Sequence, residues 1–221
     1  MPLMSEHASA SPLRIAAMVS RQGRGSNLGA LLTACETGEI AGRFAVVIGT
    51  NADAPALERA RAAGVATSIV SPRKYEGNEQ GYAAALLRIL RRHEVGLLCL
   101  AGYMRQLPPA VVTAYSERIL NVHPALLPLF GGRGMYGENV HRAVLESGMK
   151  VSGCTVHFVD EQYDTGPILV QMAVPVEEED TPSTLAARVI KAEHQAYVRA
   201  VYLIAAGRVH VEGRRIRISA P

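Results

Sequence analysis

An amide and an imidazole lie two residues apart at the end of a short apolar run, Ile119-Leu120-Asn121-Val122-His123-Pro124. Because successive strand residues point to opposite faces, Asn121 and His123 are expected to project from the same face. Pro124 has no N–H to donate and ends the strand. Such a pair could polarise a carbonyl and move a proton. On this run alone, a polar strand end that faces water is the simpler interpretation.

Asp164 and His157 could join this pair. Asp164 lies in the turn from Asp160 to Pro167, and because strand ends of α/β sheets meet at one crevice, its carboxylate could approach His123 and hold the ring charged. An Asp before Thr-Gly-Pro also commonly caps a turn. His157 lies on an apolar strand and could face the crevice, although a hydrogen-bonded core histidine is the commoner outcome. A metal site made of these two histidines and Asp164 is disfavoured, because no His-x-x-x-His spacing supports it.

A glycine-rich segment, Gly23-Arg24-Gly25, follows the apolar run 13–19 and looks like the start of a dinucleotide fingerprint. The third glycine of that fingerprint is replaced by Leu28, and no acidic residue ends a strand about 20 residues further on. Dinucleotide binding is therefore disfavoured. Gly25-Ser26-Asn27 instead leads into a helix N-terminus that suits a phosphate monoester. A plain turn capped by Ser26 or Asn27 is the alternative.

Strand-like and helix-like segments alternate along the chain. Strands are expected near residues 13–19, 44–48, 65–70, 95–100, 119–123, 153–159 and 168–174. Helices are expected near residues 28–35, 54–63 with Asp53 as a cap, 81–92, 109–114, 140–147 and 182–207, and a hairpin near 209–218. Most strands are apolar throughout, which is typical of a parallel sheet covered on both faces. The sequence predicts an α/β fold with a Rossmann-like, mostly parallel twisted sheet, helices on both faces, and a C-terminal part with added strands and a long helix.

The 221 residues, 48% hydrophobic and 19% charged, fit one globular domain over 13–221 behind a disordered N-terminal extension of residues 1–12. No apolar run reaches the roughly 18 residues of a membrane span, and Lys and Arg are scattered. Membrane and nucleic-acid partners are therefore not expected. Three cysteines without Cys-x-x-Cys spacing indicate a reducing, cytoplasmic compartment.

Four segments in order carry a family resemblance: 23–28, 100–105, 121–128 and 152–167. Together they resemble the phosphoribosylglycinamide formyltransferases of purine biosynthesis, within the formyltransferase superfamily, over about residues 13–207. The resemblance implies transfer of a formyl group from 10-formyltetrahydrofolate to the amine of glycinamide ribonucleotide, without a metal, in a monomer or homodimer. The chain departs from the family in a longer loop at 130–137 and in lacking an arginine near Glu79, which Arg73 or Lys74 could replace.

The resemblance also implies roles for individual residues. Asn121, His123 and Asp164 would be catalytic, with Asn121 donating to an oxyanion and His123, kept protonated by Asp164, passing a proton to the folate nitrogen. His157 could support them. The substrate phosphate would bind at Gly25, Ser26 and Asn27, and its ribose at Glu193. The folate would contact Asn121 and Asp164 and two segments, Met104, Arg105, Gln106 and Leu107, and Asp160, Glu161, Gln162 and Tyr163.

Rival functions remain within and outside the superfamily. A formyltetrahydrofolate deformylase normally carries an extra N-terminal domain, and a methionyl-tRNA formyltransferase an extra C-terminal one, for which the 221 residues are not expected to leave room. A nucleotide-binding module without catalysis and a metal hydrolase are the alternatives from other classes.

Overall fold

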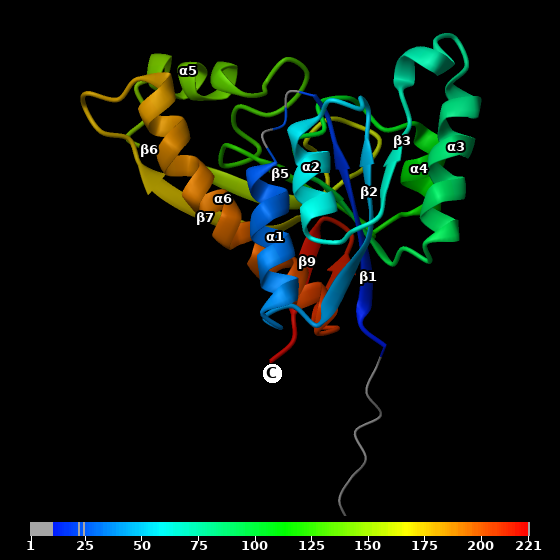
Figure 1. The fold of residues 1–221 in the computed structure, drawn as a ribbon. Coiled ribbons are helices and arrows are strands. Elements are labelled where there is room, and N and C mark those ends of the chain that lie inside the picture. Colours follow the sequence, from blue (N-terminus) through cyan, green and yellow to red (C-terminus); the bar gives the residue numbers. More distant parts are fainter. Residues whose placement is uncertain (1–10, 22, 24, 221) are drawn as a thin grey trace, which may run out of the picture.

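The computed structural model describes residues 11–21, 23 and 25–220, so most of the extension expected at residues 1–12 lies outside the described residues. Strands and helices alternate as expected (Figure 1). The main sheet has the strand order β3-β2-β1-β4-β5-β6-β7. Its strands are β1 (Leu13–Val19), β2 (Gly42–Gly49), β3 (Thr67–Ile69), β4 (Leu97–Leu100), β5 (Ile119–His123), β6 (Val151–Phe158) and β7 (Ile168–Pro175).

Strand pairing divides the sheet into two parts. From β3 to β5 every neighbouring pair is parallel, whereas β5 with β6 and β6 with β7 are antiparallel. The predicted mostly parallel sheet with added C-terminal strands is confirmed. Antiparallel pairing places residues of β6 directly opposite those of β5, so the second part of the chain contributes side chains to the end of β5.

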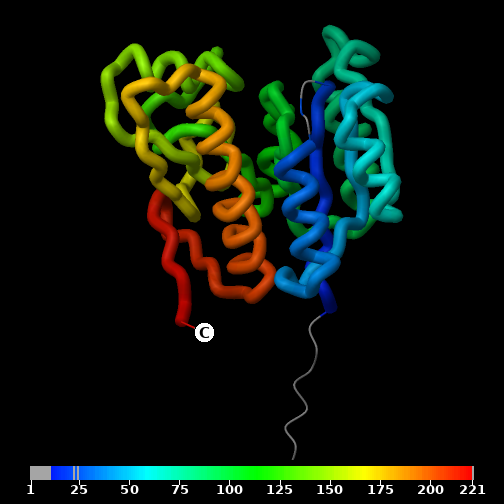
Figure 2. The backbone as a smooth tube through the Cα atoms, turned by 60° about the vertical axis from the view of Figure 1, so that its left-hand side comes forward, coloured from blue at the N-terminus to red at the C-terminus, as the bar shows by residue number. Residues whose placement is uncertain are grey.

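Helices cover both faces of the sheet. One face carries α1 (Ser26–Glu36), α2 (Pro55–Ala62), α5 (Glu138–Glu146) and α6 (Pro182–Ala205), and the other carries α3 (Glu79–Arg92) and α4 (Pro109–Ala114). Alternation along the strands explains the division, because Ile15 packs with α1 and α6 whereas Ala16 packs with α3 and α4. Figure 2 shows α1 and α6 side by side, in agreement with the contacts between them.

The C-terminal segment forms a hairpin of β8 (Val209–Glu212) and β9 (Arg215–Ile218), as predicted. Before α3 the chain also forms a short 3-10 helix, η1 (Pro72–Tyr75), where the sequence indicated only a polar loop. Within the described residues, no helix combines the length and the apolar character that a membrane crossing requires.

Helix caps differ in part from those predicted. Thr181 caps α6 through a capping box, as expected. Asp53 does not cap α2, whose N-cap is Ala54, and its carboxylate pairs with Arg21 at 3.0 Å. Neither Ser26 nor Asn27 caps α1, whose N-cap is Gly25. Gly25 has φ 73°, and a Cβ there would come within 2.9 Å of Ala56, so the entry to α1 requires a glycine.

Candidate active site

Pairing of β5 with β6 places Asn121 opposite His157 and His123 opposite Thr155. The amide Nδ2 of Asn121 lies 3.3 Å from Nε2 of His157. His157 Nδ1 lies 2.8 Å from the carbonyl oxygen of Phe158, and because a carbonyl only accepts, Nδ1 carries the proton. Nε2 faces the amide of Asn121 and is positioned to accept from it. His157 is therefore both a hydrogen-bonded core residue and a member of the crevice.

Asp164 reaches this pair from the turn between β6 and β7, with a positive φ of 57°. One carboxylate oxygen, Oδ1, lies 3.5 Å from Nδ2 of Asn121 and 3.6 Å from Nε2 of His157. The other, Oδ2, accepts from the N–H of Gly132 at 2.9 Å and lies 3.5 Å from Nδ1 of His123. The prediction that Asp164 lies within reach of the imidazole is confirmed. We call Asn121, His123, His157 and Asp164 the reacting centre.

Burial and two polar neighbours act in opposite directions on the pKa of His123. Its side chain is only 4% exposed, and burial lowers the pKa of His123, while the charge of Asp164 and the hydrogen bond to Phe130 raise it by less. Burial therefore acts against the expectation that Asp164 keeps this ring protonated, because desolvation outweighs the carboxylate. Burial raises the pKa of Asp164, but the side chain of His157, the nearby ring of His123 and the hydrogen bond from Gly132 lower it further, to a net value below its usual one. The centre thus pairs a carboxylate that favours its ionised form with an imidazole that burial shifts toward its neutral form.

Two residues that the sequence did not single out hold the loop after β5. The hydroxyl of Thr155, fully buried, donates to the carbonyl of Ala125 at 2.6 Å and accepts from the N–H of Leu127 at 3.0 Å. Gln171 on β7 donates to that same hydroxyl at 3.0 Å and to the carbonyl of Leu127 at 2.9 Å. Alternation of Thr155 with His157 was the one signal available, because Gln171 becomes a neighbour only through the β6–β7 pairing.

The residues expected to bind phosphate and ribose lie together where α1 begins. Nδ2 of Asn27 donates to Oε2 of Glu193 on α6 at 2.6 Å. Glu193 is buried, and burial raises the pKa of its carboxyl to about 7. Oδ1 of Asn27 is buried without a hydrogen-bond partner in the described residues. Ser26 opens α1 directly after Gly25, so the first N–H groups of this helix lie beside the Asn27–Glu193 pair.

The two segments expected to contact folate, 104–107 and 160–163, are neighbours in space. Nε2 of Gln106 donates to the carbonyl of Glu161 at 2.6 Å. The carboxylate of Asp160 accepts from the hydroxyl of Thr165 and the N–H of Gln162, so it serves the turn itself. Most side chains of these segments are exposed, namely Met104, Arg105, Gln106, Glu161, Gln162 and Tyr163, whereas Leu107 is buried. We call 104–107 and 160–163 the exposed segments.

Other features of the site are less closely joined to the reacting centre. A pocket of about 260 Å³ opens beside Asp164 and is also lined by Gly131, Tyr163 and Arg214. Arg73 and Lys74, the suggested replacements for a family arginine, are exposed in η1. In the part of the chain that the structure describes, no cluster of three or more His, Cys, Asp or Glu side chains is arranged to hold a metal ion.

The chain is similar to proteins of known family and structure. A family model described as formyl transferase matches residues 13–201. The chain is 42% identical to a chloroplastic phosphoribosylglycinamide formyltransferase of Arabidopsis thaliana, over 91% of this chain and 69% of that protein. It is 39% identical to the phosphoribosylglycinamide formyltransferase of Escherichia coli strain K12, over 85% of each. The crystal structure of glycinamide ribonucleotide transformylase 1 from Symbiobacterium toebii superimposes with a TM-score of 0.89 at 47% identity, over 96% of each chain.

Proposed function

This chain belongs to the phosphoribosylglycinamide formyltransferases of the formyl transferase family, and we propose that its reacting centre transfers the formyl group of 10-formyltetrahydrofolate to the amine of glycinamide ribonucleotide. The proposed site is supported chiefly by one observation: the side chains of Asn121, His123 and Asp164 lie close together at the carboxyl end of β5. Ligands of open α/β sheets bind outside this end of the strands.

The nucleophile in this reaction is the amine of the substrate. The protein therefore has to align two ligands, stabilise the tetrahedral oxyanion and move protons, and it needs no nucleophile of its own. The amide of Asn121 can donate a hydrogen bond to the oxyanion. Its two N–H groups face His157 and Asp164, which lie 3.3 and 3.5 Å from Nδ2 and hold its orientation, so the oxyanion takes the place of one of these two acceptors.

Protons move through His123 in this proposal. The neutral ring accepts the proton that the amine loses on attacking the formyl carbon, and the resulting imidazolium gives it to the departing folate nitrogen. Asp164 stabilises the imidazolium between these two steps. The 3.5 Å separation of Nδ1 from Oδ2 exceeds the 2.7–2.9 Å typical of a charge-assisted hydrogen bond, as is common in catalytic sites before the reacting complex forms.

The two ligands approach from different sides. The substrate phosphate binds the free N–H groups of Gly25, Ser26 and Asn27, and the ribose hydroxyls contact Glu193. The pterin of 10-formyltetrahydrofolate, the cosubstrate, lies between the two exposed segments that Gln106 joins to Glu161. Asp164 directly follows the second segment. The formyl-bearing nitrogen of the folate is therefore placed next to the reacting centre. The proposed steps involve no metal.

The proposed function is tested by mixing the purified protein with glycinamide ribonucleotide and 10-formyltetrahydrofolate and following the folate absorbance, with formylated product identified by mass. We expect a change that requires both substrates. Release of formate without glycinamide ribonucleotide would identify a deformylase, and no change would leave a binding protein. Prior treatment with a chelator should leave the rate unaltered, which separates the transferase from a metal hydrolase.

A further inference from the structure

The shortest hydrogen bond of the His123 side chain joins it to a backbone carbonyl outside the reacting centre. Nε2 of its ring lies 2.8 Å from the carbonyl oxygen of Phe130, the first residue of the loop before α5. A carbonyl oxygen only accepts a hydrogen bond, so Nε2 carries the proton in this contact. In a neutral ring, Nδ1 is then left with its lone pair on the side of Asp164. The Phe130 carbonyl thus selects which nitrogen is basic.

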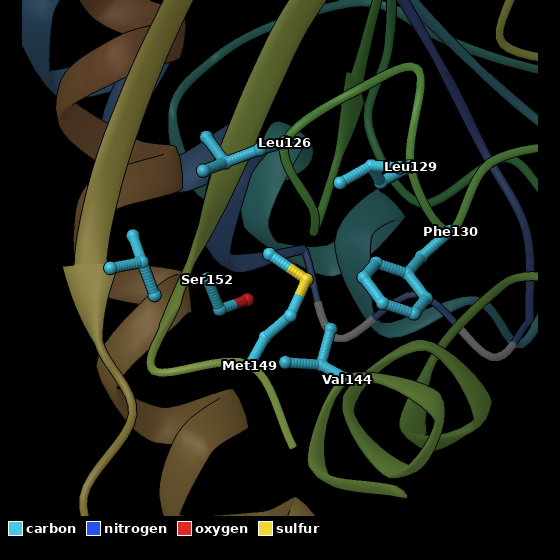
Figure 3. Close-up of a pocket in the computed structure, with 7 residues that line it drawn as sticks. Leu126, Leu129, Phe130, Val144, Met149 and Ser152 are labelled. Carbon is cyan, nitrogen blue, oxygen red and sulfur yellow. The ribbon is translucent and has the colours of Figure 1, made fainter. Parts of the chain in front are cut away.

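Phe130 holds this carbonyl in place with an unusual backbone. Its φ is 54°, a conformation that bulky side chains rarely adopt, so surrounding contacts have to maintain it. The phenyl ring supplies such contacts in a small apolar pocket that is also lined by Leu126, Leu129, Val144 and Met149. Figure 3 shows the ring of Phe130 directed toward Val144 and Met149.

We propose that Phe130 is a positioning residue for His123, whose packed side chain holds the backbone carbonyl that fixes the Nε2–H tautomer and keeps Nδ1 as the proton acceptor. This inference rests on the proposed role of His123 in proton transfer. In this proposal Phe130 acts only through the imidazole of His123. The loop at 130–137 thereby gains a specific task in the reaction.

Other groups around His123 do not duplicate this task. Asp164 faces Nδ1 from the turn after β6, and its negative charge favours a proton on that nitrogen, so it competes with the Phe130 carbonyl for the single proton of a neutral ring. The Phe130 contact at 2.8 Å is shorter than the 3.5 Å separation from Asp164. His157 from β6 and His141 from α5 are the other titratable neighbours. When either is protonated, its positive charge disfavours the protonated form of His123. The Phe130 carbonyl is the acceptor at Nε2. Loss of this hydrogen bond should lower the pKa of His123 further and allow the proton of the neutral ring to occupy either nitrogen.

The test compares three variants. Phe130→Ala removes the ring that anchors the loop, and Phe130→Leu retains an apolar anchor. Leu129→Ala is the matched control, because Leu129 lines the same pocket and is 51% exposed, and within the described residues its carbonyl makes no hydrogen bond to His123. For each, the histidine tautomer is measured by nitrogen-15 NMR, and kcat and KM are measured across pH. Circular dichroism checks the fold.

We expect the wild-type protein and Phe130→Leu to show the Nε2–H form of His123. Phe130→Ala should show a mixture of tautomers, a lower pH midpoint, and a kcat reduced about tenfold with both KM values within about twofold. A wild-type His123 in the Nδ1–H form, or a folded Phe130→Ala with the wild-type tautomer and pH profile, would overturn the proposal. Equal loss of kcat in Leu129→Ala would also overturn it. The tautomer is read without turnover, so failure of the proposed function would be seen separately.

Discussion

The reacting centre and the exposed segments are adjacent but built in contrasting ways. In the centre, the side chains of His123 and His157 are 4% and 3% exposed, and every member is held by at least two contacts from different elements. In the exposed segments, Met104 and Tyr163 are 37% and 39% exposed, and a single side-chain hydrogen bond, from Gln106 to Glu161, joins the two.

The contrast indicates a division of labour. Burial shifts the pKa values of side chains and holds their positions, and proton transfer between aligned groups requires both. Exposed side chains instead form a surface that can adapt to a ligand. Substitutions in the reacting centre should therefore lower kcat. Substitutions in the exposed segments should raise the KM for folate. A reacting-centre substitution that raised only the KM for folate, or an exposed-segment substitution that lowered only kcat, would contradict this division.

The largest expected effect is that of Asp164→Asn. The amide keeps the shape of the side chain but cannot stabilise an imidazolium at His123, so kcat should fall by at least about 100-fold. The KM for each substrate should stay within about threefold, as measured by steady-state kinetics.

Asp160→Asn is the matched control for this substitution, since Asp160 lies in the same turn and its carboxylate bonds to Thr165 and Gln162. Its kcat should remain within about threefold of the wild-type value, on the division of labour above. A comparable loss of kcat in both variants would mean that the turn, and not the carboxylate of Asp164, is what matters.

The second effect is a pH dependence set by burial. Because the pKa of His123 is lowered, the neutral ring persists to lower pH than in an exposed histidine, and kcat/KM should fall about tenfold per pH unit only below about pH 6.5. Folding stability should follow the same direction, because the unfolded chain takes up this proton before the folded one does, so acid favours unfolding. A rate profile with its midpoint above pH 7 would contradict the neutral assignment.

Thr155→Val should have an intermediate effect. Valine keeps the volume but removes the hydroxyl that bonds to Ala125, Leu127 and Gln171, which leaves buried polar groups unpaired. The free energy of unfolding should fall by about 1–3 kcal/mol, as measured by urea denaturation. Thr113→Val, on the exposed face of α4, should change it by less than about 0.5 kcal/mol.

Gln106→Ala should have the smallest effect. It removes an exposed neutral hydrogen bond of about 0.5–1 kcal/mol, so the KM for 10-formyltetrahydrofolate should rise about two- to fivefold with kcat unchanged. Isothermal titration with the folate checks the affinity directly. An equal loss in kcat would show that the exposed segments take part in the chemistry.

Much of the fold followed from local patterns. The apolar strands predicted a mostly parallel sheet, and the two-residue spacing of Asn121 and His123 with Asp164 at a strand-end turn predicted their meeting. The charge state of His123 could not be predicted in this way, because it depends on burial under the loop after β5. The contacts of Gln171 and the carbonyl of Phe130 likewise depend on tertiary packing that no local spacing encodes. The cap at Gly25 was missed because close approach to Ala56 decides it.

The most direct test of the reacting centre is the single-turnover rate of formyl transfer in His123→Ala with both substrates saturating. Binding and product release do not limit this rate, so it reports the chemical step alone. The proton-transfer role predicts a rate at least about 100-fold below wild type, with substrate affinities within about threefold and an unchanged circular dichroism spectrum. A rate within about threefold of wild type would contradict it.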